Sequence, residues 1–320
     1  MLEVTGLTKA FGSFQAVKGI NFSIEKGRCT ALLGPNGAGK TTTLRMLTGL
    51  LEPSGGSIAY REGKQVTATR PEDYRQLIGY LPQMPSFYNW MNGMEYVVYA
   101  GRLCGLSTAE AKKKAGLLLK RVGLEQAAKR KIGGYSGGMR QRLGLAQALV
   151  HEPRLLVMDE PVSALDPIGR REVLSLLQEL KSEMTILFST HVLHDAEELC
   201  DDIIIIREGE VALSGSLQQV QQQHRQPIIE VRLEGEGSEG KQKLESWLRA
   251  AEAAVSSVSG KPLFDNIEKQ ERLILFTAQQ LDEGRQWLME HLTRNQLKIS
   301  KLEVGHSSLE QLFMRVVSER

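Results

Sequence analysis

The chain has 320 residues, of which 41% are hydrophobic and 24% are charged, a composition that supports a large core and more than one domain. Its formal net charge is only +2, so no global basic field indicates nucleic-acid binding. The three cysteines, Cys29, Cys104 and Cys200, match no zinc or redox spacing, which indicates free thiols in a reducing compartment.

The first elements of the chain are predicted strands. Leu2–Thr5 and Phe22–Ile24 alternate apolar and polar residues, which is typical of antiparallel strands with one solvated face. Phe11 lies between them. Taken alone, it is either an aromatic that stacks on an adenine ring or a core residue at the end of a strand.

A glycine-rich segment follows and fits the spacing G-x-x-x-x-G-K-[ST] of a phosphate-binding loop. Arg28–Leu33 before it predicts a buried strand, and Thr42–Leu50 after it predicts a helix. Its backbone N–H groups are expected to converge on a phosphate at the positive end of the helix dipole. We expect Lys40 to reach the β- and γ-phosphates and Thr41 to bind Mg²⁺. The predicted nucleotide-binding residues of the loop are Gly34, Pro35, Asn36, Gly37, Ala38, Gly39, Lys40, Thr41 and Thr42.

The middle of the chain predicts a helical insertion. Leu77–Gln83 reads as a strand that runs into a loop, so Gln83 stands where a side chain reaches a metal-bound water, although alone it is an ordinary loop residue. Residues 85–134 are mostly helical in pattern, and Ser107 with Glu110 fits a capping box. We therefore expect a helical subdomain inserted into a nucleotide-binding core.

Two further segments predict sites at the ends of elements. Ser136 is a suitable N-cap, and Gly137 and Gly138 leave N–H groups open at a second helix terminus, which either binds an anion or is a plain cap. Leu155–Glu160 is apolar and ends in two acids, which is typical of a central parallel strand that meets a ligand. Asp159 is expected to bind Mg²⁺ and Glu160 to polarise the attacking water.

The chain then predicts a turn at Ser163–Asp166 and another buried strand that ends at His191. A single histidine at a strand end is more often structural than catalytic. Together, however, these motifs resemble the ATP-binding subunit of an ABC transporter in order and spacing. The resemblance covers about residues 1–216 and overrides the ordinary interpretations of Gln83, Ser136 and His191.

The resemblance implies roles for individual residues. It makes Phe11 the aromatic that stacks on adenine, and it makes Gln83 the glutamine that senses Mg²⁺ and faces the membrane partner. Glu160 becomes the catalytic carboxylate and His191 the switch histidine. Two groups are then expected to act across a dimer interface: Ser136, Gly137 and Gly138 as the signature that closes over the γ-phosphate of the other subunit, and Asp166 as the loop acid.

Two residues depart from the family pattern. Tyr135 and Met139 stand where Leu and Gln are commonest in the signature. The serine and both glycines that make the phosphate contact are intact, so we interpret the changes as subfamily variation. The resemblance implies that ATP and Mg²⁺ join two subunits and that hydrolysis releases them.

The remainder of the chain predicts a smaller domain. Residues 217–226 are glutamine-rich and read as a solvated helix or linker. Strands are predicted at 228–233, 255–258, 272–277 and 297–304, with helices at 241–254 and 281–292, an order typical of a ferredoxin-like α+β domain. The ending Ser307–Phe313 resembles one found in bacterial ABC ATPases of the drug, antibiotic and ion exporter branch.

The overall prediction is an α/β protein with a RecA-like P-loop NTPase core, an antiparallel β subdomain, an inserted helical subdomain and an accessory domain at 227–320. The function implied is ATP hydrolysis that drives export through an integral-membrane permease, with a second ATP-binding subunit and without nucleic acid. No signal peptide or apolar run of ~18 residues is present, so any membrane role is expected to come through a partner. The resemblance implies a peripheral protein at the cytoplasmic membrane face. The alternative is a soluble ABC ATPase that acts on a macromolecular assembly.

Overall fold

The computed structural model describes residues 1–62, 65–163, 165–224, 226–234, 247, 249, 263–270, 273–278, 280–295 and 297–318. The chain divides into two compact units, Met1–Val220 with Val316–Arg320, and Gln221–Arg315. The predicted domain boundaries at 216 and 226 stay a prediction. The segment that was expected to be a helix or linker is helix α8 (Leu217–His224), and the last residues of the chain group with the first unit.

The centre of the first unit is a six-stranded sheet in the order β10-β9-β3-β8-β7-β6. All of its pairs are parallel except the edge pair of β9 and β10. Every residue of β3, β7 and β8 is buried, as the continuous apolar runs of a sheet covered on both faces predict. The strands are β3 (Cys29–Leu33), β6 (Ile78–Leu81), β7 (Leu155–Asp159), β8 (Thr185–Thr190), β9 (Asp202–Arg207) and β10 (Glu210–Ser216).

A second, antiparallel sheet has the order β2-β1-β4-β5. The pairing of Leu2 with Ile24 confirms that the two alternating stretches near the N-terminus are neighbouring strands. Apolar side chains of this sheet, of helix α1 (Lys40–Leu47) and of the central sheet form one core cluster. The strands are β1 (Leu2–Phe11), β2 (Phe14–Ile24), β4 (Gly55–Glu62) and β5 (Gln65–Ala68), and α2 (Pro71–Tyr74) and a 3₁₀ turn (Arg75–Leu77) lead to β6.

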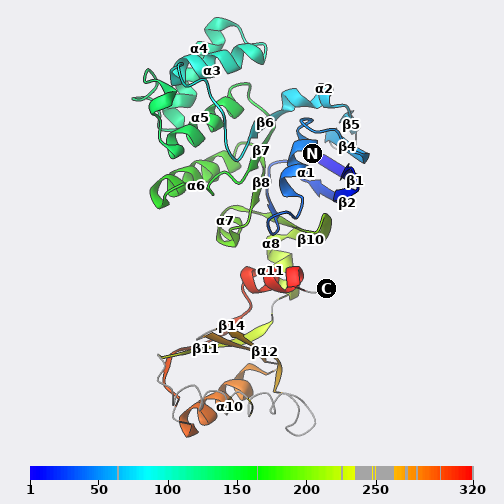
Figure 1. The fold of residues 1–320 in the computed structure, drawn as a ribbon, viewed down its shortest axis with the longest axis vertical. Coiled ribbons are helices and arrows are strands. Elements are labelled where there is room, and N and C mark those ends of the chain that lie inside the picture. The colour runs from blue at the N-terminus through cyan, green and yellow to red at the C-terminus, as the bar shows by residue number, and fades with distance from the viewer. Residues whose placement is uncertain are drawn as a thin grey trace. The chain divides into compact units, whose positions relative to one another are not determined.

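Helices cover the central sheet on both faces. Helix α1 lies on one face and α5, α6 and α7 lie on the other (Figure 1). The helical subdomain contains α3 and α4, and α4 begins with the predicted capping box of Ser107 and Glu110. No helix within the described part of the chain combines the length and the hydrophobicity needed to cross a bilayer. The helices are α3 (Gly93–Leu103), α4 (Thr108–Arg121), α5 (Gly137–Leu149), α6 (Pro167–Lys181) and α7 (Leu193–Leu199), with a 3₁₀ turn at Ile132–Gly134.

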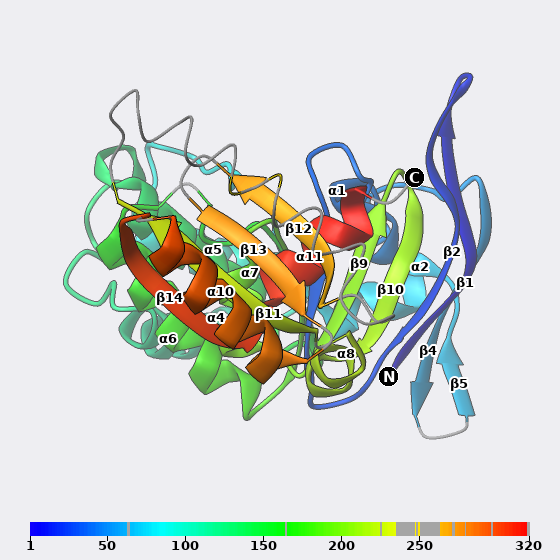
Figure 2. The same ribbon diagram turned by 90° about the horizontal axis from the view of Figure 1, so that it is seen from below.

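The second unit is an antiparallel sheet in the order β12-β13-β11-β14, with helix α10 (Leu281–Arg294) against one face (Figure 2). The ferredoxin-like arrangement of this unit stays a prediction. The predicted strand at 255–258 and most of the predicted helix at 241–254 lie outside the described residues. The strand that pairs beside β13 was not predicted. The strands are β11 (Pro227–Leu233), β12 (Phe264–Gln270), β13 (Leu273–Ala278) and β14 (Ile299–His306), and helix α11 (Leu309–Ser318) follows.

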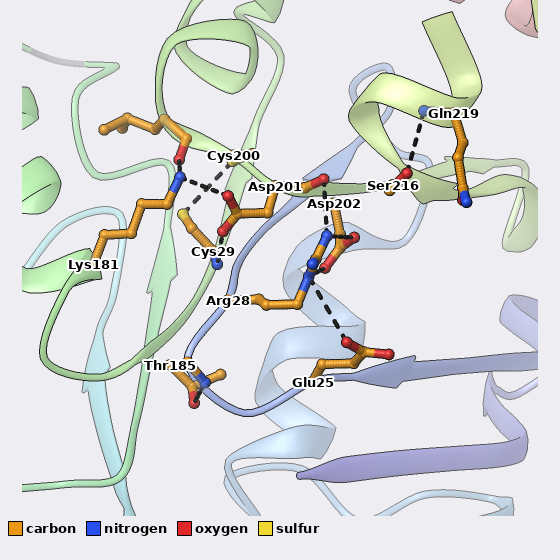
Figure 3. Close-up of polar contacts among 12 residues, drawn as sticks. Glu25, Arg28, Cys29, Lys181, Thr185, Cys200, Asp201, Asp202, Ser216 and Gln219 are labelled. Carbon is orange, nitrogen blue, oxygen red and sulfur yellow. Dashed lines mark hydrogen bonds and ion pairs between the residues drawn. The ribbon is translucent and has the colours of Figure 1, made fainter. Parts of the chain in front are cut away.

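Polar contacts fix the start of β3 against the junction between α7 and β9 (Figure 3). The Arg28 guanidinium donates to both carboxylate oxygens of Asp202, at 2.5 and 2.6 Å. The Cys29 N–H donates to the Asp201 carboxylate at 2.9 Å, and Lys181 lies 2.7 Å from the same carboxylate. The main-chain hydrogen bond and the Lys181 ammonium outweigh the desolvation of Asp201, so its pKa lies below the usual value. The strand that leads to the phosphate loop is thus anchored at its far end.

Two glycines of the first unit give opposite expectations for an added methyl group. A Cβ at Gly79 in β6 would lie 2.3 Å from the Ala148 carbonyl oxygen of α5, so Gly79→Ala forces the helix from the sheet. We expect this variant to lose about 2 kcal/mol and about 5 °C in its thermal midpoint. Gly116 lies within α4 with no atom closer than 4.0 Å, so Gly116→Ala should gain about 0.8 kcal/mol. Thermal unfolding of both variants checks the packing, and equal midpoints would contradict it.

Candidate nucleotide site

The carboxyl ends of the parallel strands bring four predicted segments to one edge of the sheet. The phosphate loop follows β3, Gln83 follows β6, Glu160 follows β7 and His191 follows β8. The register aligns these ends, because Leu33 pairs with Thr190 and Asp159 pairs with Ser189. Ligands of open α/β sheets bind at such an edge.

The phosphate loop packs directly on the turn between β9 and β10. The Gly209 N–H donates to the Ala38 carbonyl oxygen at 3.0 Å. A Cβ at Gly34 would lie 2.3 Å from the Ile206 carbonyl oxygen, so only glycine permits this approach. Gly39 has φ 105°, a left-handed conformation that glycine adopts without strain, and it directly precedes α1. The loop is therefore held by main-chain contacts that leave its amide groups at the start of a helix.

Lys40 is the first residue of α1 and is 6% exposed. Its ammonium group donates to the Gly34 and Pro35 carbonyl oxygens at 2.7 and 3.1 Å. Burial lowers the pKa of Lys40, and the nearby carboxylates of Glu160 and Asp159 oppose that shift. A phosphate in the loop would add negative charge beside this ammonium and favour its protonated form.

The three residues predicted to be catalytic meet at the Glu160 carboxylate. Gln83 Nε2 donates to Oε2 at 3.1 Å, and His191 Nδ1 lies 3.1 Å from Oε1. The side chain of Glu160 is only 11% exposed, whereas that of His191 is 48% exposed. A carboxylate only accepts hydrogen bonds, so a neutral His191 ring carries its proton on Nδ1 and leaves Nε2 as an acceptor. The carboxylate is therefore oriented from two sides by separate strands.

Ser189 fixes the backbone beneath this carboxylate, a role that sequence reasoning missed. Its hydroxyl donates to Asp159 Oδ1 at 2.6 Å and accepts from the Glu160 N–H at 3.0 Å. Glu160 has φ 46°, a left-handed conformation that is uncommon for a residue with a side chain. The Ser189 hydrogen bonds hold Glu160 in this conformation, and such strain concentrates at functional sites.

A cavity of about 770 Å³ opens above the loop. Phe11 and Phe14 stand opposite each other in the β1–β2 hairpin and are 51% and 63% exposed at its wall. Phe14, Ala16 and Ser163 were not predicted as lining residues. The hairpin register would have indicated Phe14, because it places the two rings on one side. The lining residues are Phe11, Phe14, Ala16, Asn36, Gly37, Ala38, Gly39, Lys40, Thr41, Thr42, Gln83, Glu160, Ser163 and His191.

The signature residues and Asp166 do not line this cavity. Ser136 caps α5 by accepting from the Met139 N–H at 3.3 Å, and Asp166 caps α6 by accepting from the Gly169 N–H at 2.7 Å. The two helix starts lie side by side, because a Cβ at Gly138 would be 3.9 Å from the Gly169 Cα. One chain therefore presents two separate groups of predicted site residues.

Tyr135, one of the two departures in the signature, has a structural explanation. Its side chain is buried, and its hydroxyl donates to the Ala127 carbonyl oxygen at 2.7 Å. Burial raises the pKa of Tyr135, so the hydroxyl keeps its proton and remains a donor. A leucine here would lack this hydrogen bond to the loop before the signature. The larger residue ties the signature to the helical subdomain.

Comparisons with known proteins agree with this geometry. The family model for the ABC transporter matches residues 17–163. The ABC transporter ATP-binding protein YxlF of Bacillus subtilis is 44% identical over 317 residues, which cover 99% of each chain. The chain belongs to the ATP-binding proteins of ABC transporters. Such cassettes bind and hydrolyse ATP, and the chain is an ATPase of this family.

Other relatives of this ABC ATPase carry more specific names. The daunorubicin/doxorubicin resistance ATP-binding protein DrrA of Streptomyces peucetius is 33% identical, covering 98% of this chain and 91% of its own. A solved ATP-binding subunit of an ABC transporter has a TM-score of 0.61 and 33% identity, covering 70% of this chain and 92% of that one. A dimeric, post-hydrolysis structure of the cassette MJ0796 bound to ADP and Pi has the same TM-score, 27% identity, and coverages of 68% and 99%.

The Lys40 geometry predicts a change in nucleotide affinity. Lys40→Ala removes the ammonium that lies within the phosphate loop, and hydrogen bonds to charged groups contribute roughly 1.5–3 kcal/mol. We expect the Kd for ATP to rise between about tenfold and about a hundredfold in a fluorescent-nucleotide titration. Lys26→Ala, at an exposed lysine outside the cavity, is the matched control. Unchanged affinity in the Lys40 variant would exclude the phosphate-loop assignment.

Proposed function

We propose that this chain is the energising ATPase of a membrane exporter and that Glu160 activates the water that cleaves ATP. The observation that carries the proposal is the Glu160 carboxylate, held between Gln83 and His191 at the wall of the phosphate-loop cavity. A carboxylate at this position accepts a proton from water at the point where the γ-phosphate of a loop-bound nucleotide would end. His191 orients the carboxylate through Nδ1 and offers Nε2 to the reacting group.

In this proposal the hairpin aromatics bind the base of the nucleotide. Phe11 and Phe14 are the exposed rings of the cavity wall, and either ring offers a face to adenine. The amides of Gly37, Gly39 and Lys40 bind phosphate oxygens. Positioning and charge neutralisation then account for most of the acceleration, because phosphoryl transfer asks little covalent chemistry of the protein.

Mg²⁺ fits the donor set that this edge of the sheet offers. The Thr41 hydroxyl, the Gln83 amide oxygen and the Asp159 carboxylate are the hard oxygen ligands that this cation prefers. Ser189 occupies only one oxygen of Asp159 within the described contacts. When bound, the cation would neutralise charge on the β- and γ-phosphates. These three residues are the ones that we propose hold it.

We further propose that two copies complete each other's sites. Ser136, Gly138 and Asp166 lie together at the starts of α5 and α6 and outside the cavity of their own chain. Open N–H groups at a helix start suit the γ-phosphate of a nucleotide held by another copy. The relative MJ0796 forms a dimer with ADP and Pi, which supports this arrangement.

The permease is proposed to dock on an aromatic face of the helical subdomain, which we define as Tyr88, Trp90, Tyr99 and Leu103. These residues are 51%, 70%, 40% and 70% exposed. The ring of Tyr88 contacts those of Trp90 and Tyr99, with centroids 5.9 and 6.1 Å apart. Phe87, in contrast, is half-buried against Tyr96 and belongs to the subdomain core. Exposed aromatic clusters of this kind act as anchors for protein partners.

The names of the relatives support export as the purpose of the cycle. LnrL of Bacillus subtilis is a linearmycin resistance ATP-binding protein that is 40% identical over 68% of this chain. DrrA is a daunorubicin/doxorubicin resistance protein that matches nearly the whole chain. We infer that the chain works at the cytoplasmic membrane face and energises export of a compound of the antibiotic class. The permease would provide the path for that compound.

The decisive variant for the catalytic assignment is Glu160→Gln. It keeps the shape and the hydrogen bond to Gln83 but removes the proton acceptor, so we expect ATP turnover to fall at least about a hundredfold. ATP binding should persist and trap a two-copy complex, which size-exclusion chromatography with light scattering would detect in Mg-ATP. Turnover at the parent rate would reject Glu160 as the base. A strictly monomeric Glu160→Gln protein in Mg-ATP would reject the shared site.

The aromatic face predicts a separable defect. Trp90→Ala removes the most exposed aromatic ring, so we expect several-fold less permease to co-purify with the ATPase from detergent-solubilised membranes. Leu50→Ala, at a 63% exposed residue after α1, is the control and should retain the permease. ATP binding by the purified Trp90 variant should match that of the parent. Full recovery of the permease with the Trp90 variant would place the docking site elsewhere.

A further inference from the structure

The helical subdomain is much more basic than the chain that contains it. Residues 85–134 include nine Lys or Arg and three Glu, a formal net charge of +6, whereas the whole chain has +2. Two of the three acids, Glu95 and Glu110, accept main-chain hydrogen bonds in the capping boxes of α3 and α4. The positive charge is therefore concentrated on one subdomain with little acid to balance it.

Part of this charge forms a basic loop, which we define as Lys129, Arg130 and Lys131. All three residues are exposed, and none of them forms an ion pair with a residue that the structure describes. Lys114 and Arg121 of the same subdomain differ, because they pair with Glu152 and Glu183. Among the described residues, the basic loop thus has no ion-pair partner that accounts for its charge.

Main-chain contacts place the basic loop beside the aromatic face. The Ile132 N–H donates to the Met91 carbonyl oxygen at 2.9 Å, and Asn92 bridges Lys131 in antiparallel fashion. Met91 and Ile132 are buried, whereas the residues next to them in the chain, Trp90 and Lys131, are exposed. An exposed tryptophan and a lysine without an ion-pair partner among the described residues therefore flank the same main-chain contact.

We propose that the basic loop and the adjoining Trp90 bind the anionic headgroup surface of a lipid bilayer. Lys and Arg near an anionic leaflet each contribute about 1 kcal/mol, and tryptophan prefers the boundary between headgroups and acyl chains. The apolar side chain of Leu103, 70% exposed on the aromatic face, favours lipid over a nucleic-acid strand. The proposal rests on the proposed function only in that the chain works at a membrane.

The aromatic face and the basic loop can be occupied together, the first by the permease and the second by lipid headgroups. A permease is embedded in the bilayer, so the ATPase surface around the docking face would lie close to the lipid headgroups. When the permease is docked, the rings of Tyr88, Trp90 and Tyr99 contact it, and Trp90 contacts lipid only when the permease is absent. The basic loop reaches the charged leaflet in either state. Direct lipid contact would keep the ATPase at the membrane in the open state of its cycle.

The test is sedimentation of the purified full chain with vesicles of phosphatidylcholine, with and without phosphatidylglycerol. We expect binding only to the anionic vesicles, weakening as salt rises. The triple variant Lys129→Gln, Arg130→Gln and Lys131→Gln should partition on the order of a hundredfold less. Its ATP turnover in solution should equal that of the parent, which shows that it is folded.

A matched triple variant tests whether vesicle binding depends on the basic loop itself or only on the net charge of the protein. Lys269→Gln, Arg294→Gln and Lys298→Gln remove the same charge from exposed positions of the second unit and should leave vesicle binding intact. Vesicles that contain brominated phosphatidylglycerol should quench the tryptophan fluorescence of the parent protein more than that of the Trp90→Phe variant. Equal loss in both triple variants, binding to neutral vesicles alone, or capture of single-stranded RNA without vesicle binding would overturn the proposal. The basic-loop triple variant should still co-purify with the permease from detergent-solubilised membranes. This result would separate the loss of lipid binding from a loss of permease docking.

Discussion

The parallel register of β3, β7 and β8 is the constraint on which the site depends. The pairing of Leu33 with Thr190 and of Asp159 with Ser189 brings three strand ends to the same level. The phosphate loop, the acidic pair and His191 then lie within side-chain reach without any long connection. A shift of one residue in β7 would turn Asp159 and Glu160 to the opposite faces of the sheet. The buried apolar strands therefore determine the position of the chemistry.

A second constraint acts within that edge. Glu160 is held in a left-handed conformation by hydrogen bonds to the Ser189 side chain and main chain, at 3.0 and 3.1 Å. This conformation turns the chain sharply after β7 and aims the carboxylate at Gln83 and His191. The strain is maintained because neighbouring strand β8 supplies the acceptor atoms. In the proposed mechanism, this positioning of the carboxylate would reduce the reorganisation required during hydrolysis.

The sequence predicted the features that local chemistry determines. The glycine spacing, the acids at a strand end and the capping box of α4 each depend on residues close together in the chain. Ser189 and Phe14 were missed because their roles depend on a neighbouring strand or on hairpin register. Strand β12 was missed for a related reason: it lies at the sheet edge, and its polar sequence carries little apolar alternation. The two-unit boundary depends on where the last helical residues pack, which no local pattern encodes.

The segment after β6 links the Glu160 carboxylate to the aromatic face and the basic loop, which we propose meet the permease and the lipid. Gln83 donates to Glu160, and only four residues separate it from Tyr88 of the aromatic face. Pro82 and Pro85 flank Gln83 and limit the backbone freedom of the segment, which would favour the transmission of a movement at Tyr88 to Gln83. Force on the aromatic face would therefore move Gln83 relative to Glu160, and a change at the nucleotide would act in the reverse direction. Such reciprocity is required of any coupling between a nucleotide site and a partner surface. The basic loop adjoins the same surface through the Asn92–Lys131 bridge, so lipid contact would favour one position of this segment over another.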